Sequence, residues 1–173
     1  MELGGKYKEK EPENGLAFLS TLTKLKTLII SVTGQVLQTL PLTLEGLTFR
    51  YIRLSDKDIS YFPAFSNLKA LSFCAHTKRL SGEGLAQLPS TLERLELPFS
   101  SLSDKDMSAL SSFSNLKELW IGIDRGLDGP RINRHLPMSL TRCKICLEKY
   151  LPAQQNEIKL YFEQHRPGLM QGT

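Results

Sequence analysis

Cys143 and Cys146 stand three positions apart, in the C-x-x-C spacing of many zinc and thiol–disulfide redox sites. A zinc ion would need a second C-x-x-C pair or paired histidines, and Cys74 is the one other cysteine of the chain. A redox pair lies at the start of a helix, whereas this pair lies in an alternating, strand-like segment. We therefore predict a buried Cys143 and a surface Cys146, with no metal site and no cofactor site.

Residues that could act in catalysis are scattered or have a simpler role in folding. No serine or cysteine lies at an obvious nucleophile turn beside a histidine, and the histidines are His76, His135 and His165. The carboxylate pairs are Asp56/Asp58 and Asp104/Asp106. They follow Ser55 and Ser103 in the order S-x-x-D, which is typical of a capped helix start. Since the chain also lacks a G-x-x-x-x-G-K-[ST] phosphate loop, we predict that it is not an enzyme.

Charge and composition narrow the possible partners and compartments. The 173 residues carry a formal net charge of +4, and Glu96 and Glu118 interrupt the one candidate basic stripe, so we predict no nucleic-acid binding. No apolar run approaches the ~18 residues of a membrane span, and we predict no membrane association. The polar start lacks the apolar segment of a secretory signal. Three cysteines, an odd number, suit a reducing cytoplasm.

A sequence repeat positions these residues. The pattern L-x-x-L-x-Φ, in which Φ is a large apolar residue, recurs at a constant interval along most of the chain. Its second apolar position is occupied by Leu47, Leu71, Leu95, Leu119 and Cys143. An earlier copy lies at Leu28, and the step from there to Leu47 is shorter than the others. The second apolar residue and Φ point to the same side of a strand, so the period predicts stacked parallel strands that share a core.

A second period, twice as long as the first, predicts two alternating repeat types with short helices between the strands. The segment 54–58 recurs as 102–106, and the segment 65–69 recurs as 113–117.

The periods also divide the chain into three parts. We predict a flexible arm or cap at residues 1–18, about six repeats at 19–147, and a helical cap with a tail at 148–173. Within the last part, the pattern of 153–165 predicts an amphipathic helix over the open end of the core.

These patterns resemble leucine-rich repeats, a family recognised by L-x-x-L-x-L strands at a spacing of ~20–29 residues. The resemblance implies an α/β solenoid with a parallel, concave sheet and short helices on the convex side. The helical segments and the lack of cysteine caps resemble the intracellular and bacterial type. The starts of the form Leu-Pro-x-Thr-Leu-Glu are similar to those in effectors of intracellular bacterial pathogens. The asparagine that usually follows the third apolar position is absent, so other groups must satisfy the turns.

Alternation along the strands assigns the side chains of the concave face. The central column across the strands is Ile29, Thr48, Ser72, Glu96, Trp120 and Lys144, beside Thr27, Gly46, Ala70, Arg94, Glu118 and Arg142. Trp120 points to solvent in this scheme, as binding hot spots do. The alternative is a ring lying flat under Arg94 or Lys144. The predicted partner-binding residues are Arg50, Ser72, Arg94, Glu96, Glu118, Trp120, Arg142 and Lys144.

We predict a non-enzymatic module that binds a protein partner through this face and has no small-molecule substrate. The resemblance to effectors implies delivery into a host cell by a specialised secretion system, with a host protein as partner. Two alternatives remain. A substrate-recognition or adaptor part of a ubiquitin-ligase assembly would need an F-box or a catalytic domain, and residues 1–18 are too short for either. An enzyme with an unrecognised site is the less favoured alternative.

Overall fold

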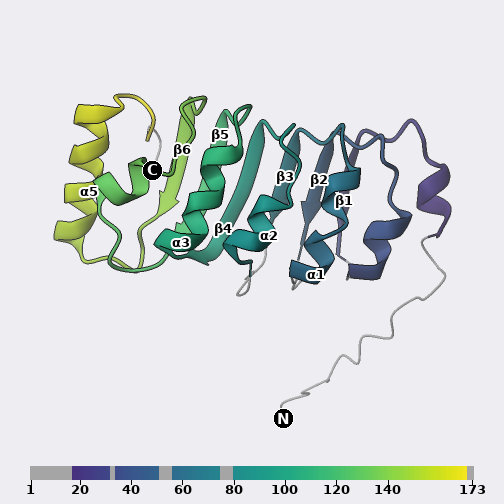
Figure 1. The fold of residues 1–173 in the computed structure, drawn as a ribbon, viewed down its shortest axis with the longest axis horizontal. Coiled ribbons are helices and arrows are strands. Elements are labelled where there is room, and N and C mark those ends of the chain that lie inside the picture. Colours follow the sequence, from purple (N-terminus) through teal and green to yellow (C-terminus); the bar gives the residue numbers. More distant parts are fainter. Residues whose placement is uncertain (1–16, 32–33, 51–55, 75–79, 171–173) are drawn as a thin grey trace, which may run out of the picture.

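Six parallel strands form one sheet in chain order (Figure 1). The computed structural model describes residues 17–31, 34–50, 56–74 and 80–170. The strands are β1 (Thr27–Ile30), β2 (Gly46–Phe49), β3 (Ala70–Phe73), β4 (Arg94–Leu102), β5 (Glu118–Ile123) and β6 (Arg142–Cys146). Each strand pairs in parallel with the next, which gives a mixed α/β fold with an all-parallel sheet.

The register between strands follows the sequence repeat. The residues that stand opposite one another across the sheet are Leu28, Leu47, Leu71, Leu95, Leu119 and Cys143. The shorter first step, from Leu28 to Leu47, is therefore accommodated without a change of register. Because neighbouring strands are ~4.8 Å apart, the inward side chains form continuous columns from one end of the sheet to the other.

Short helices lie in a row on one face of the sheet (Figure 1). The α-helices of this row are α1 (Asp56–Ile59), α2 (Gly82–Ala86), α3 (Asp104–Met107) and α4 (Gly129–Asn133). The 3-10 helices are η1 (Ala17–Thr21), η2 (Gly34–Thr39), η3 (Phe62–Ala64) and η4 (Ser108–Ser112). Neighbouring helices contact one another in the same order as the strands. The core fills the layer between this row and the sheet, and the face of the sheet away from the row is called the open face below.

Aromatic rings fill the core between β2, β3 and η3. The rings of Phe49 and Phe73 stack with their centroids 5.3 Å apart, and Phe62 tilts against both at 6.1 Å. All three side chains are at most 1% exposed. Burying a side chain of this size stabilises the fold by about 1.5–3 kcal/mol. The columns of leucine and phenylalanine are therefore the main source of stability.

The predicted cap at Ser103 is confirmed, and it also links two repeats. The Ser103 hydroxyl accepts a hydrogen bond from the Asp106 amide at 3.2 Å, and Asp106 accepts one from the Ser103 amide at 3.1 Å. A further bond to Asp106, at 2.8 Å, comes from the amide of Gly82 at the start of α2. Burial alone would raise the pKa of Asp106. Hydrogen bonds donated to its carboxylate by the Ser103 hydroxyl, at 2.6 Å, and by the amides of Gly82 and Ser103, together with the charge of Lys105, lower it. The equivalent Ser55 lies outside the described residues.

Hydroxyl side chains bond some repeats to the repeat before them. Thr91 donates to the carbonyl of Leu68, and Ser139, two repeats later, donates to the carbonyl of Leu116, both at 2.7 Å. Thr43 occupies the same position two repeats before Thr91, but its buried hydroxyl has no hydrogen-bond partner within the described ranges.

Two asparagines extend this pattern. Asn67 donates through Nδ2 to the carbonyl of Leu42 at 3.3 Å, and Asn115 donates to the carbonyl of Ser90 at 3.0 Å. Both bonds reach back into the turn before the previous strand. The polar links therefore recur with the longer, two-repeat period.

Ser100 shows how one turn is satisfied without the missing asparagine. The serine is 3% exposed, and its hydroxyl lies 2.7 Å from the carbonyl of Leu97 and 2.8 Å from the carbonyl of Gly122. It also accepts a hydrogen bond from the amide of Gly122 at 3.1 Å. A Cβ at Gly122 would lie 2.2 Å from the carbonyl oxygen of Ser100 and 2.8 Å from that of Pro98. The turn therefore needs both a hydroxyl at 100 and a glycine at 122.

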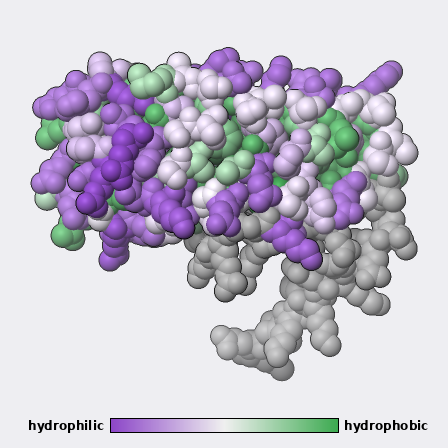
Figure 2. Space-filling model, viewed as in Figure 1, coloured by the Kyte–Doolittle hydropathy of each residue, from purple (hydrophilic) through white to green (hydrophobic). Residues whose placement is uncertain are grey.

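A longer helix, α5 (Pro152–His165), lies beside α4 at the β6 end, where the sequence predicts a helix at 153–165 (Figure 1). Ile158 and Phe162 are buried, whereas Leu160 is 55% exposed and does not join the core. Hydrophilic side chains gather over this end of the molecule (Figure 2). After α5, the carbonyl of Leu169 accepts a hydrogen bond from the Cys143 amide of β6 at 2.7 Å. None of the helices in the described part of the chain is both long enough and apolar enough to span a membrane.

Gly122→Ala should lower the free energy of unfolding by about 2–3 kcal/mol, because the added methyl group overlaps backbone atoms that cannot rotate away. Urea denaturation followed by circular dichroism measures the change. Gly46→Ala is the matched control, because its Cβ would meet only the Thr27 side chain, at 3.3 Å. Equal midpoints for the two variants would contradict the role assigned to Gly122.

Candidate interaction surface

Side chains of β4, β5 and β6 gather on the open face of the sheet. Glu96, Trp120 and Lys144 stand opposite one another in one column. The column beside it holds Arg94, Glu118 and Arg142. These two columns agree with those predicted from alternation, and none of the six side chains is buried. The six residues are called the β4–β6 patch below.

One carboxylate in the patch is shared by two guanidinium groups. Arg94 Nε lies 2.7 Å from Glu118 Oε2, and Arg142 Nη1 lies 3.5 Å from Glu118 Oε1. The side chains of Arg94 and Arg142 are 51% and 74% exposed, against 28% for Glu118. Exposed pairs of this kind contribute only ~0–1 kcal/mol each. Their main effect is therefore to orient the side chains, and the column keeps a positive charge.

Trp120 is partly covered rather than fully exposed. Lys144 Nζ lies over the indole ring, 4.6 Å from its centroid, as the cation–π alternative predicts. The indole Nε1 donates a hydrogen bond to the Cys146 sulfur at 3.1 Å. Lys144 and Cys146 thus hold the ring in one orientation on the open face, and part of it remains exposed to solvent.

Ser72 joins the patch from β3 but is too buried to be a broad contact. Its hydroxyl donates to Glu96 Oε2 at 2.8 Å and lies 3.5 Å from the Cys74 sulfur, and the residue is 9% exposed. Ser72 therefore positions Glu96. Arg50 is exposed but follows β2, two strands away from β4, so the fold does not bring it into the patch.

The two cysteines of the C-x-x-C motif lie on opposite faces, as the alternation predicts. Cys143 is buried in the core, whereas Cys146 is partly exposed on the open face beside Trp120. Burial raises the pKa of the Cys143 thiol to about 12, against the weaker opposite effect of Arg166. Across the described ranges, no three His, Cys, Asp or Glu side chains are placed to hold one metal ion.

Asp104 lies in the first turn of α3, as predicted, and also has a role that the sequence does not predict. Its carboxylate is paired with Arg134 and lies 2.9 Å from Nε2 of His135, so it links α3 to α4 on the helical face. The hydrogen bond from Arg134, followed by that from His135, lowers the pKa of Asp104. Arg134 and His135 are 30 and 31 residues away from Asp104 in the sequence, so no local pattern predicts this cluster. The cap itself is made by Ser103 and Asp106.

Tyr150 was also not singled out from the sequence. Its hydroxyl donates to the carbonyl of Asp124 at 2.6 Å and accepts from the amide of Leu127 at 3.2 Å. The buried tyrosine therefore fixes the segment that follows β5.

Comparison with known proteins adds no identification, because neither a family model nor a curated protein matches the chain.

Lys144→Ala should shift the fluorescence emission of Trp120 to longer wavelength and increase its quenching by acrylamide, because the ammonium group and its stem no longer cover the ring. Trp120 is the single tryptophan, so its spectrum is read directly. Lys149→Ala, an exposed lysine outside the patch, should leave the spectrum unchanged. An unshifted Lys144→Ala spectrum would rule out the ring contact.

Cys143 should resist alkylation in the folded protein while the exposed Cys74 reacts. The thiolate is the reactive form, and a pKa of about 12 keeps Cys143 protonated at neutral pH. Because folding raises this pKa above the ordinary value of 9.0, burial of the neutral thiol stabilises the fold fully below pH 9, and that contribution is lost as the pH rises toward about 12. Peptide mapping after iodoacetamide treatment, with and without urea, measures the order in which the two thiols are labelled. Equal labelling rates for Cys143 and Cys74 in the folded protein would refute the predicted protection of Cys143.

Proposed function

We propose that the chain is a leucine-rich-repeat solenoid that acts as a non-enzymatic interaction module and binds a protein partner through the β4–β6 patch. The observation that carries the proposal is Trp120, a tryptophan held in one orientation by Lys144 and Cys146 on a face of the sheet that no helix of the described residues covers. If this face were buried in the fold, it would not need a tryptophan held in this way. If it only contacted water, a partly exposed indole ring would add no stability to the fold.

The regular register supports this proposal. It places Arg94 and Glu96 on β4, Glu118 and Trp120 on β5, and their counterparts on β6 in two straight columns. Rows of side chains at the ~4.8 Å strand spacing present a surface that a partner can contact across several strands. The strands are rigid, so little backbone order has to be gained when the partner binds.

The fixed orientation of Trp120 supports it further. An indole ring is a frequent hot spot because it offers a large contact area. Here Lys144 and Cys146 already fix the ring, so binding would cost little side-chain entropy. The Lys144 ammonium can remain over the ring at the rim of the interface.

The charge of the patch favours an acidic partner segment. Arg94, Arg142 and Lys144 face only Glu96 and Glu118, and the Glu118 carboxylate is already shared by both arginines. A partner carboxylate would therefore meet exposed guanidinium donors, and its attraction would raise the association rate and weaken with added salt. The resemblance of the Leu-Pro-x-Thr-Leu-Glu starts to bacterial effectors makes a host protein our proposed partner.

Trp120→Ala should weaken capture of the partner at least tenfold, as expected for removal of a hot spot worth about 2 kcal/mol. Affinity capture from a eukaryotic cell lysate, quantified by mass spectrometry, compares the variant with the wild-type protein. Leu160→Ala is the matched control, because it removes an apolar side chain that is 55% exposed on α5, outside the patch. Circular dichroism must show that both variants fold. Equal capture by Trp120→Ala, Leu160→Ala and the wild-type protein would refute the proposal.

A further inference from the structure

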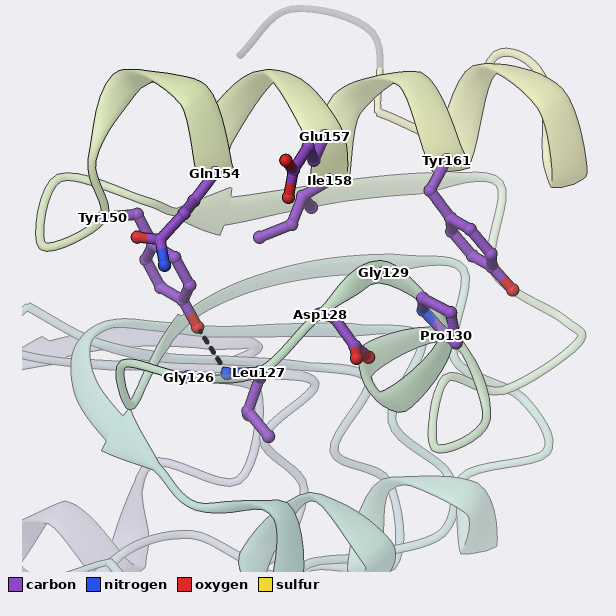
Figure 3. A pocket seen from close by; sticks show the side chains of 10 residues that line it. All are labelled: Gly126, Leu127, Asp128, Gly129, Pro130, Tyr150, Gln154, Glu157, Ile158 and Tyr161. Atoms are coloured by element: carbon purple, nitrogen blue, oxygen red, sulfur yellow. Dashed lines mark hydrogen bonds between the residues drawn. The ribbon is translucent and has the colours of Figure 1, made fainter.

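A pocket of about 270 Å³ lies between α5 and the segment 126–130 that follows β5 (Figure 3). It is on the helical side of the molecule and does not belong to the β4–β6 patch. Gln154, Glu157 and Ile158 extend from α5 on one side, and Leu127 and Asp128 lie on the other. The volume is slightly below the ~300–1,000 Å³ typical of sites for drug-sized ligands. The pocket can therefore hold a group about the size of one side chain.

Contacts at both ends keep the two walls of the pocket at a fixed distance. At one end, Tyr150 holds the loop through its hydrogen bonds to Asp124 and Leu127. At the other end, Gly129 lies against Tyr161, where a Cβ would be 2.4 Å from Cγ of the ring. The gap between these contacts is therefore present before any ligand binds, and it costs no rearrangement to occupy.

The interior of the pocket is apolar, and its rim is acidic. Leu127, Tyr150 and Ile158 are buried and provide the apolar walls. Asp128 and Glu157 are exposed and provide two carboxylates. One oxygen of Asp128 accepts a bond from the Arg131 amide, whereas Glu157 has no hydrogen bond or ion pair to any other described residue. Asp128 thus caps the start of α4, and Glu157 provides negative charge at the rim that no other described residue neutralises.

This charge stands against a basic background. Residues 125–173 contain eight lysines and arginines and four acidic residues. Two of those four acidic residues line the pocket, and none of the eight basic residues does. An anionic ligand would be repelled by these carboxylates. A neutral ligand would cover them and remove their hydrogen bonds to water without providing an equivalent interaction. A divalent cation would lack a third ligand, because no three acidic, histidine or cysteine groups of the described chain converge.

We infer that this pocket binds a lysine or arginine side chain of a partner polypeptide. The alkyl stem would lie along Leu127, Tyr150 and Ile158, and the cationic head would reach the carboxylates of Asp128 and Glu157 at the rim. Long basic side chains bind in this way, with an apolar stem buried and a charged head near water. This second site is independent of the proposed role of Trp120, because it lies on the other side of the sheet layer.

A titration of the full chain, labelled with ¹⁵N, tests the inference by NMR. The probes are N-acetyl-lysine methylamide and N-acetyl-arginine methylamide, with N-acetyl-norleucine methylamide as the uncharged probe. The amide signals of 126–130, Gln154 and Glu157 should move with the two cationic probes and not with norleucine. Signals that move equally with norleucine, or only outside these residues, would overturn the inference.

Glu157→Gln removes the charge while keeping the shape, and it should raise the dissociation constant for the lysine probe about fivefold. Glu157 is exposed and unpaired among the described residues, so this variant should fold normally. Glu163→Gln is the matched control, since it removes an exposed carboxylate of the same helix outside the pocket. The control should bind as the wild-type protein does. Equal dissociation constants for the two variants would show that the rim charge does not select the ligand.

Discussion

Each repeat depends on its neighbours to bury its apolar side, and this constraint determines the rest of the structure. A short strand with a single turn of helix has too little surface to form a core alone. Stacking in a fixed register lets Leu71 lie between Leu47 and Leu95, and the same holds along the whole sheet. Because the inward columns must coincide, the outward residues of successive strands also coincide. The alignment of Arg94, Glu118 and Arg142 is therefore a by-product of core packing.

Polar groups reinforce the same constraint. Thr91, Ser139, Asn67 and Asn115 all donate to carbonyls of the preceding repeat, so the bonds that satisfy one turn are made by the next repeat. Thr43 is an exception, because its buried hydroxyl has no hydrogen-bond partner among the described residues. Apolar burial supplies most of the energy, and these bonds fix how the repeats are aligned.

The sequence predicts the features that depend on period and alternation, and misses those that depend on packing between distant segments. The strand register, the two faces of Cys143 and Cys146, the Ser103 cap and the helix near 153–165 all follow from local patterns. The spacing of residues allows Lys144 to cover Trp120 but does not determine that it does, because spacing does not fix the rotation of side chains. The Asp104 cluster and the pocket below α5 require the relative position of elements that lie far apart in the sequence.

The alternation of two repeat types determines how the length of such a protein can change during evolution. Duplication or deletion of two consecutive repeats would keep Thr91 and Ser139 at equivalent positions of the longer period. The same holds for Asn67 and Asn115. Duplication or deletion of a single repeat would keep the apolar columns aligned. It would, however, place hydroxyls such as that of Thr91 opposite a turn of the other repeat type. Gain or loss of a pair of repeats would therefore preserve these bonds, whereas a change of a single repeat would not. The open face would gain or lose two strands at a time, so its outline would change in steps of about 10 Å.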